Sequence, residues 1–154
     1  MDTLTTLLEQ AEAERNLALA AFNQARARCE AARAQAAQLD AYRADYQRRW
    51  GQQFALGAAL EIVRCYQGFA ARLDTAIAQQ GHAVALTQAT QARAGDALTA
   101  NELRLASVRK LIERRAQAER QASHQRDQKA EDEHAMRIAL SRRDGHLGIT
   151  GVRA

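Results

Sequence analysis

The chain has 154 residues, no proline and only 5% aromatic residues, while alanine, arginine and glutamine are abundant in its composition. Chains built from strong helix formers in this way favour long helices over a globular core. The net charge of +4 comes entirely from residues 101–154, because residues 1–100 contain ten acidic and ten basic side chains. This distribution argues against a uniformly basic nucleic-acid-binding protein.

The first predicted helix covers residues 2–50. Alternating steps of four and three residues from Leu4 reach fourteen positions, of which only Arg15 and Arg43 are polar. A period of 3.5 sustained over six heptads is typical of a coiled coil rather than of an amphipathic helix alone. The positions are Leu4, Leu8, Ala11, Arg15, Ala18, Phe22, Ala25, Cys29, Ala32, Ala36, Leu39, Arg43, Tyr46 and Trp50.

The heptad pattern stops after residue 50, where Gly51 and Gly57 bracket a short segment and predict a turn over residues 51–57. A second register of fourteen positions follows, and ten of them are apolar. It comprises Tyr66, Ala70, Leu73, Ile77, Gln80, Val84, Thr87, Gln91, Ala94, Leu98, Asn101, Leu105, Val108 and Ile112. We therefore expect an all-α fold in which two long helices form an antiparallel coiled-coil hairpin.

The second helix is expected over residues 58–142, within a single hairpin domain of residues 1–142. Folding the chain about residue 53 sets Leu4 opposite residues 101–105, so the remainder of the second helix has no partner in the hairpin. Polar helices without a packing face are only marginally stable in water. Residues 143–154 contain three glycines and are expected to form a flexible tail.

Catalytic and metal chemistry is not predicted. The four histidines occur singly, without the spacing of a metal site, and no serine or cysteine has a plausible base nearby. We expect no cofactor, no small-molecule substrate and no enzyme activity. The longest apolar runs are about five residues, against the ~20 needed to cross a bilayer, and no signal core is present. Cys29 and Cys65 indicate reduced thiols, which suits a cytoplasmic or peripheral protein.

Aromatic residues near the turn form the first candidate partner surface. Tyr42 and Tyr46 are spaced i, i+4 on the first helix, and a second stripe lies one position away from the main register of the second helix. That stripe consists of Phe69, Leu73, Ala76 and Gln80. The stripes form either a widened core or an exposed apolar patch that binds a partner. In both cases some of Tyr42, Phe69 and Ala76 should be partly exposed.

A basic segment at residues 109–115 is the second candidate surface. Its charged members are Arg109, Lys110, Arg114 and Arg115, together with Glu113, and they flank two residues of the apolar seam. One interpretation is a solvated helix face beside that seam. The other is docking onto an acidic partner, to which arginine can bind in a bidentate manner.

Three segments resemble the FliJ family of the bacterial flagellar type III export apparatus. They are residues 39–46, residues 66–77 and residues 127–135, the last of which begins Asp127-Gln128-Lys129. The resemblance implies an antiparallel coiled coil similar to the central stalk of rotary ATPases. It also implies three partners, namely the hexameric export ATPase FliI, the export gate protein FlhA and the export chaperones.

The resemblance also implies which residues contact these partners. The gate-contacting patch would consist of Leu39, Tyr42, Tyr46, Phe69, Leu73, Ala76 and Gln80. The ATPase end would consist of Arg109, Lys110, Arg114, Arg115, Asp127, Gln128 and Lys129.

These implications together predict a non-enzymatic stalk that couples the state of the ATPase to protein export through the gate. The protein would be cytoplasmic and peripheral at the inner membrane. Two alternatives are the equivalent stalk of a virulence type III secretion system and a generic basic coiled-coil adaptor. An adaptor that binds nucleic acid or anionic membrane through its charge should dissociate steeply with salt, and the neutral first hundred residues argue against it.

Overall fold

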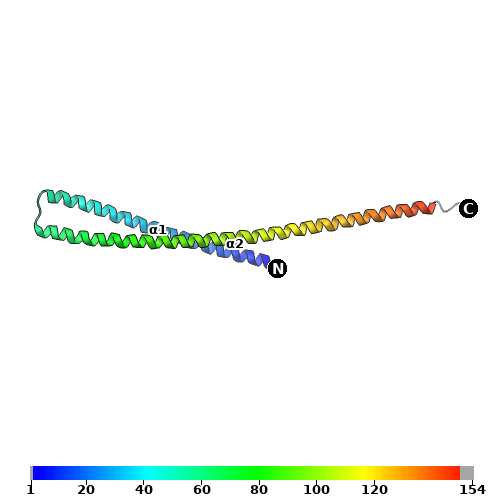
Figure 1. Ribbon diagram of the computed structural model, residues 1–154, viewed down its shortest axis with the longest axis horizontal. Coiled ribbons are helices and arrows are strands. Elements are labelled where there is room, and N and C mark those ends of the chain that lie inside the picture. Colours follow the sequence, from blue (N-terminus) through cyan, green and yellow to red (C-terminus); the bar gives the residue numbers. More distant parts are fainter. Residues whose placement is uncertain (1, 150–154) are drawn as a thin grey trace. The chain divides into compact units, whose positions relative to one another are not determined.

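The computed structural model describes residues 2–149 as two helices joined by a short turn (Figure 1). Helix α1 spans Thr3–Ala55 and helix α2 spans Leu60–Ile149, and no strand occurs within these residues. The expected all-α class is confirmed. The chain divides into two units, Met1–Ala106 and Ser107–Ala154. None of the helices, over the residues described, is long and apolar enough to cross a membrane.

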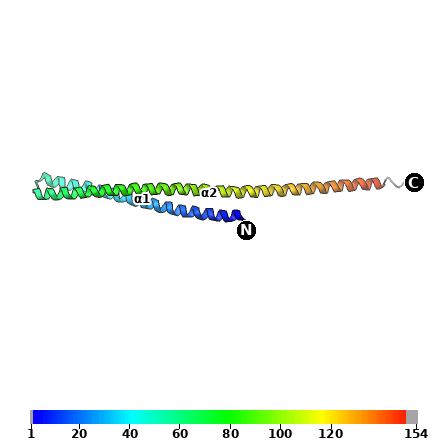
Figure 2. The same ribbon diagram turned by 60° about the horizontal axis from the view of Figure 1, so that its bottom comes forward.

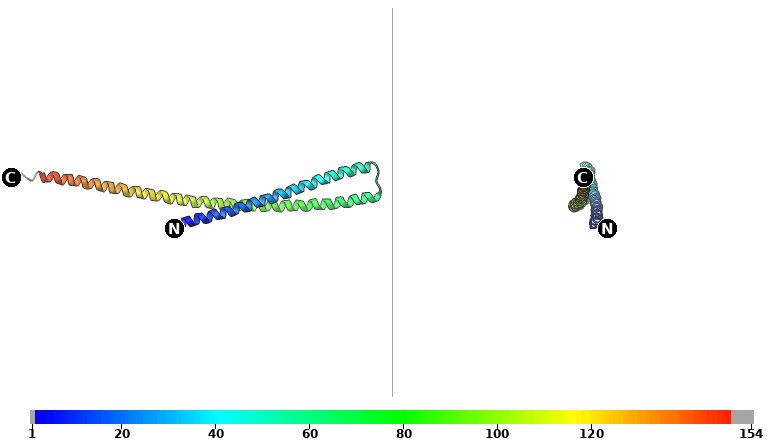
Figure 3. Two further views of the ribbon diagram at one scale, coloured as in Figure 1. Left: turned by 180° about the vertical axis from the view of Figure 1, so that it is seen from behind. Right: turned by 90° about the vertical axis from the view of Figure 1, so that its right-hand side faces the viewer.

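The first unit is an antiparallel hairpin in which α1 packs along the first part of α2. The two helices cross one another in the views of Figures 1 and 2, and the rear view in Figure 3 shows the same pairing. All fourteen positions of the first register are buried or half-buried, as are the twelve of the second register from Tyr66 to Leu105. The predicted seam of the coiled coil is therefore confirmed position by position.

The core of this hairpin is thin because its most buried side chains are mostly small. They are Ala11, Ala25, Cys29 and Ala32 from α1, with Leu73 and Leu105 from α2. Gly95 lies against the ring of Phe22, where an added Cβ atom would be 3.4 Å from Cε2 and thus in ordinary van der Waals contact with it. The core is filled by close approach of the two helices and not by large side chains. Each buried alanine removes little apolar surface from water.

A polar side chain also enters the seam. Gln80 donates a hydrogen bond from Nε2 to the backbone carbonyl oxygen of Ala32, at 2.9 Å across the hairpin. Since hydrogen-bond strength depends steeply on distance and angle, this bond favours one sliding position of α2 against α1. Gln80 is half-buried and its amide is already used inside the hairpin.

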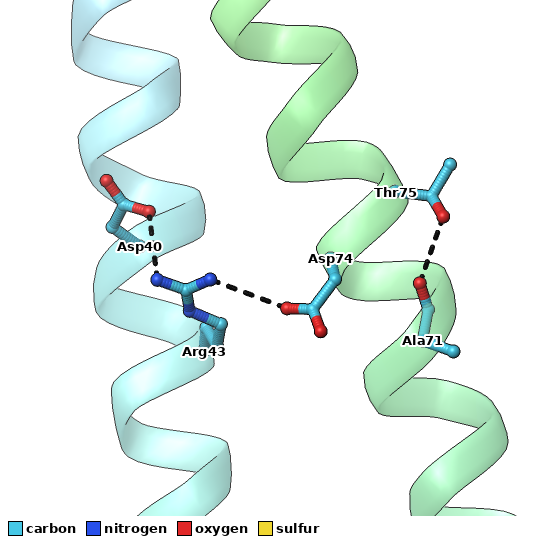
Figure 4. A network of polar contacts seen from close by, with 5 residues as sticks. All are labelled: Asp40, Arg43, Ala71, Asp74 and Thr75. Carbon is cyan, nitrogen blue, oxygen red and sulfur yellow. Dashed lines mark hydrogen bonds and ion pairs between the residues drawn. The ribbon is translucent and has the colours of Figure 1, made fainter.

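Arg43 and Arg104 form ion pairs between the helices at the edge of the seam. Arg43 lies 3.4 Å from Asp74 on α2 and 3.9 Å from Asp40 on its own helix, as Figure 4 shows. Arg104 lies 2.8 Å from Glu14 in the half of the hairpin away from the turn. All these side chains are at least one-third exposed, so each pair contributes little to stability.

The turn lies later in the chain than the sequence predicts. Helix α1 continues through Gly51 to Ala55, so the predicted end at residue 50 and the predicted turn over 51–57 are displaced. A glycine inside a helix costs only about 1 kcal/mol. The helical spacing that it preserves brings the Phe54 ring against that of Trp50, with centroids 5.5 Å apart and the ring planes tilted by 39°. Such ring pairs contribute about 0.5–1.5 kcal/mol beyond their buried area, which offsets the glycine.

Gly57 makes the turn itself. Its φ of 92° lies in the left-handed region, which glycine adopts without the steric penalty of a side chain. The N–H of Leu56 donates to the carbonyl of Gln53, and the N–H of Gly57 donates to that of Phe54. These bonds satisfy carbonyl groups at the end of α1, as expected for a helix that ends at a glycine.

The second unit contains the remainder of α2 and packs very differently. Among residues 107–146, only Val108, Ile112 and Ala116 are half-buried, and every side chain from Gln117 to His146 is exposed. The helix runs past the predicted end at residue 142 to Ile149, because the lone Gly145 lowers helix propensity without terminating the helix. The predicted flexible tail is thus helical over residues 143–149, and residues 150–154 lie outside the described part.

Candidate functional site

Six of the seven aromatic side chains gather where α1 meets the beginning of α2, and we call this group the aromatic cluster. Four come from α1 at i, i+4 spacing, which places them along one face of the helix. Its members are Tyr42, Tyr46, Trp50 and Phe54 on α1, with Tyr66 and Phe69 on α2. Phe22 alone among the aromatic residues lies elsewhere.

Tyr46 is the centre of the aromatic cluster. Its ring centroid lies 4.6 Å from that of Phe69, 5.4 Å from Tyr66, 6.0 Å from Trp50 and 6.2 Å from Tyr42. These separations are in the range at which aromatic pairs attract each other. Large aromatic rings therefore pack between the helices near the turn, whereas alanine and cysteine side chains pack between them in the middle of the hairpin.

The seven residues of the expected gate patch divide between core and surface. Leu73 is 7% exposed and belongs to the core, while Tyr42 is 51% exposed. The other five are half-buried, namely Leu39, Tyr46, Phe69, Ala76 and Gln80. The expectation that some of Tyr42, Phe69 and Ala76 are partly exposed is confirmed. The cluster widens the core and leaves the Tyr42 ring half-exposed, while the binding of a partner at this ring stays a prediction.

Tyr42 is held in place although half of it is exposed. Its ring stacks on Tyr46 and meets Phe69 edge-on, with ring centroids 6.3 Å apart in the second case. Two aromatic neighbours restrict the rotamers of this side chain before any partner arrives. An exposed ring that is already ordered loses little conformational entropy on binding.

The expected ATPase end lies in the second unit and is fully exposed. Arg115 lies 3.6 Å from Glu119 one helical turn later. Leu111, between the basic side chains, is 52% exposed. The exposed charged and polar members are Arg109, Lys110, Arg114, Arg115, Asp127, Gln128 and Lys129. Whether this face is a docking surface or a solvated helix face stays a prediction.

The described residues contain no group of three or more histidine, cysteine or acidic side chains that could hold a metal ion. Cys29 is buried and Cys65 is exposed, and both are free thiols.

Sequence reasoning missed part of the aromatic cluster. The heptad count assigns Trp50 and Tyr66 only to the seam, and the predicted turn includes Phe54. The signal for the cluster is the spacing of four residues that continues from Tyr42 and Tyr46 through Trp50 to Phe54. A predicted helix end at residue 50 excludes the last of these steps.

A family model described as Flagellar FliJ protein matches residues 1–144. The chain belongs to the FliJ family. Members of this family are structural stalk proteins of flagellar type III protein export, and that role applies to this chain. The match spans both candidate surfaces, and its flagellar description favours flagellar over virulence-type export. No curated protein and no solved structure matches the chain.

Proposed function

We propose that this FliJ-family chain is a connector that docks in the hexameric export ATPase FliI, contacts the export gate protein FlhA and couples the state of the ATPase to export. The observation that carries the proposal is the family match over residues 1–144, which includes two surfaces of different chemistry. One is aromatic and lies in the first unit. The other is basic and lies in the second unit.

The aromatic surface suits a gate contact because it offers an ordered, half-exposed ring. Interface hot spots are enriched in tyrosine, tryptophan and arginine, and Tyr42 is followed directly by Arg43. Phe69 supports Tyr42 from α2 and is itself half-buried. A partner that covers Tyr42 would also cover the edge of Phe69, and thus bury a continuous apolar area.

The basic surface suits an acidic cavity in the ATPase. Arginine guanidinium groups form paired, charge-assisted hydrogen bonds with carboxylates, and Arg109, Arg114 and Arg115 are all exposed. Every side chain from Gln117 to His146 is exposed, so this part of the helix has no packing face within the described residues. A surrounding partner would supply the contacts that such a helix lacks in water.

Export-chaperone handling and a location at the cytoplasmic face of the inner membrane complete the proposal. Both follow from the family resemblance, and we assign no residue to chaperone binding. A connector between a cytoplasmic ATPase and a membrane gate must work at that face.

The gate contact is tested with Tyr42→Ala. Leu73 is unsuitable for this purpose because it is buried, and its truncation would loosen the hairpin itself. We expect Tyr42→Ala to weaken binding to the cytoplasmic part of FlhA by about tenfold while the protein still stimulates FliI. Leu86→Ala, which removes a 70% exposed apolar side chain elsewhere on the hairpin, is the matched control. Loss of ATPase stimulation with intact gate binding would refute this assignment.

The ATPase contact is tested by replacing Arg109, Arg114 and Arg115 with glutamine. We expect this variant to lose stimulation of FliI and to keep gate binding. The matched control replaces three exposed hairpin arginines, namely Arg28, Arg33 and Arg93, which lowers the net charge equally. An unchanged interaction of the first variant with FliI, or equal losses in both variants, would exclude specific docking through the basic surface.

A further inference from the structure

The turn that joins the two helices is aliphatic and exposed. Leu56 is 89% exposed, Leu60 is 66% exposed and Ile62 is 43% exposed. Ala58 and Ala59 lie between them and are also exposed. We call these five residues the aliphatic tip. No polar side chain occurs from Phe54 to Leu60.

The fold does not require aliphatic side chains at this turn. Gly57 supplies the left-handed backbone conformation, and the bonds that end α1 come from backbone N–H groups. Turns are usually rich in small polar residues, which cap the chain and remain hydrated. The side chains of Leu56 and Leu60 remain largely in water and so contribute little to the stability of the hairpin. Their exposure thus has no structural explanation within the chain.

Aromatic and cationic side chains follow directly behind the tip. Trp50 and Tyr66 belong to the part of the aromatic cluster nearest the turn. Arg48, Arg49 and Arg64 lie at the same end and are exposed. An aliphatic tip bordered by tryptophan, tyrosine and arginine is the arrangement found where proteins enter the interface of a bilayer.

The charge around the tip is slightly positive. Arg48 and Arg49 share the single carboxylate of Asp45, at 2.6 Å and 3.1 Å, so one positive charge of this trio is not neutralised. The charges of Arg64 and Glu61 on α2 are opposite and sum to zero. A surface with this excess should prefer anionic lipid to neutral lipid, and each additional arginine near such a surface adds to the attraction.

We propose that the aliphatic tip inserts into the surface of an anionic lipid bilayer. The hairpin would thereby be held against the membrane by its turn, without crossing it. This proposal concerns residues outside both surfaces assigned above, and it does not depend on contact with FlhA or FliI.

The position and size of the tip favour lipid over protein as the occupant. The turn from α1 to α2 forms the end of the hairpin (Figure 3), and the side chains of Leu56 and Leu60 are largely exposed there. Stable protein interfaces bury about 1,200–2,000 Å² in total, which needs far more surface than the five residues of the aliphatic tip provide. A bilayer can cover an exposed tip from all sides and needs no complementary groove.

The single tryptophan of the chain serves as a built-in reporter. Trp50 lies in the aromatic cluster beside the tip, and its indole ring contacts Phe54 and Tyr66. The experiment mixes the full chain with protein-free vesicles of phosphatidylcholine alone or of phosphatidylcholine with phosphatidylglycerol. Sedimentation with the vesicles measures binding, and emission of Trp50 with brominated lipid as quencher measures insertion.

We expect the wild-type chain to bind the anionic vesicles, with a blue shift of Trp50 emission and quenching by brominated lipid. Replacing Leu56 and Leu60 with serine should weaken binding by about tenfold, because the inserted apolar area is lost. Arg64→Gln should lower the preference for anionic vesicles by about fivefold. Circular dichroism should show unchanged helix content, because the replaced side chains are exposed.

The matched control replaces Leu86 and Leu103 with serine, two leucines that are 70% and 69% exposed away from the turn. This variant should bind vesicles as well as the wild type. No binding to protein-free vesicles, or an equal loss in tip and control variants, would overturn the proposal. Binding only to vesicles that carry FlhA would assign the tip to a protein partner instead, and would also overturn it.

Discussion

The two units of the chain are built from the same helix-forming residues, yet only the first contains a packed seam. In the hairpin, one side chain in every three or four along α2 is covered by α1. In the second unit, every side chain from Gln117 to His146 is exposed. Helix propensity is similar in both, but most helical stability in proteins comes from tertiary packing. We therefore expect the hairpin to be stable by itself, and residues 117–146 of the second unit to be stabilised by a partner.

Proline substitutions should separate the two units most strongly. Ala94→Pro lies at a half-buried seam position of α2 and should destabilise the hairpin by about 3 kcal/mol or more. Ala122→Pro lies in the exposed second unit and should lower helix content while it leaves hairpin stability unchanged. Chemical unfolding followed by Trp50 emission reports on the hairpin alone. Equal destabilisation of the hairpin by the two prolines would contradict the expected difference in packing between the two units.

The next largest effect on unfolding free energy should come from truncation of a buried leucine, compared with truncation of an exposed one. Leu105→Ala removes a side chain that is 2% exposed and should cost about 2–3 kcal/mol of unfolding free energy. Leu103→Ala, two residues earlier and 69% exposed, should change it by less than about 0.5 kcal/mol. Thermal unfolding measured by circular dichroism compares them. A similar loss for both leucines would show that the seam does not extend to this part of α2.

The hydrogen bond across the seam should contribute less. Gln80→Ala removes the donor to the Ala32 carbonyl and should lower the free energy of unfolding by about 1 kcal/mol. Gln79→Ala, the adjacent exposed glutamine, serves as the control. Urea unfolding of the two variants measures the difference. If Gln80→Ala were as stable as its control, the bond would play no part in fixing the register.

Ion pairs should give the smallest effect. The pair between Arg104 and Glu14 joins the two helices and should show a coupling energy of about 0.5 kcal/mol in a double-mutant cycle, reduced by salt. The pair between Arg115 and Glu119 lies within the second unit and should show none in hairpin stability. A larger coupling for the second pair would mean that the two units unfold as one.

The sequence was sufficient to predict the seam. A regular step of four and three residues selects positions by geometry alone, and polar members such as Arg15 and Gln80 occupy seam positions as the count requires. The same count includes Tyr46 in the seam and leaves Tyr42 on its flank, and in the structure the ring of Tyr42 is half-exposed. Periodicity decides which face of a helix packs, and it does so without knowledge of the partner helix.

The turn and the contacts across the seam were beyond the reach of periodicity. Whether Gly51 ends α1 depends on the energy of the Trp50 and Phe54 rings on the second helix, and local propensity does not contain that energy. The hydrogen bond from Gln80 to Ala32 depends on the distance between the two helix backbones. That distance is set by small side chains on α1, far from Gln80 in the sequence. The aliphatic tip is not predicted either, because the predicted boundary at residue 57 places Leu56 in the turn and Leu60 in the second helix.

Hydrogen exchange at single-residue resolution, on the full chain alone and with the FliI hexamer, shows whether residues 117–146 are stabilised by a partner. We expect slow exchange of α2 amides in residues 66–105 under both conditions. We expect fast exchange in residues 117–146 of the free chain and strong protection of the same residues in the complex. Slow exchange of residues 117–146 in the free chain, or no gain of protection with FliI, would contradict this expectation.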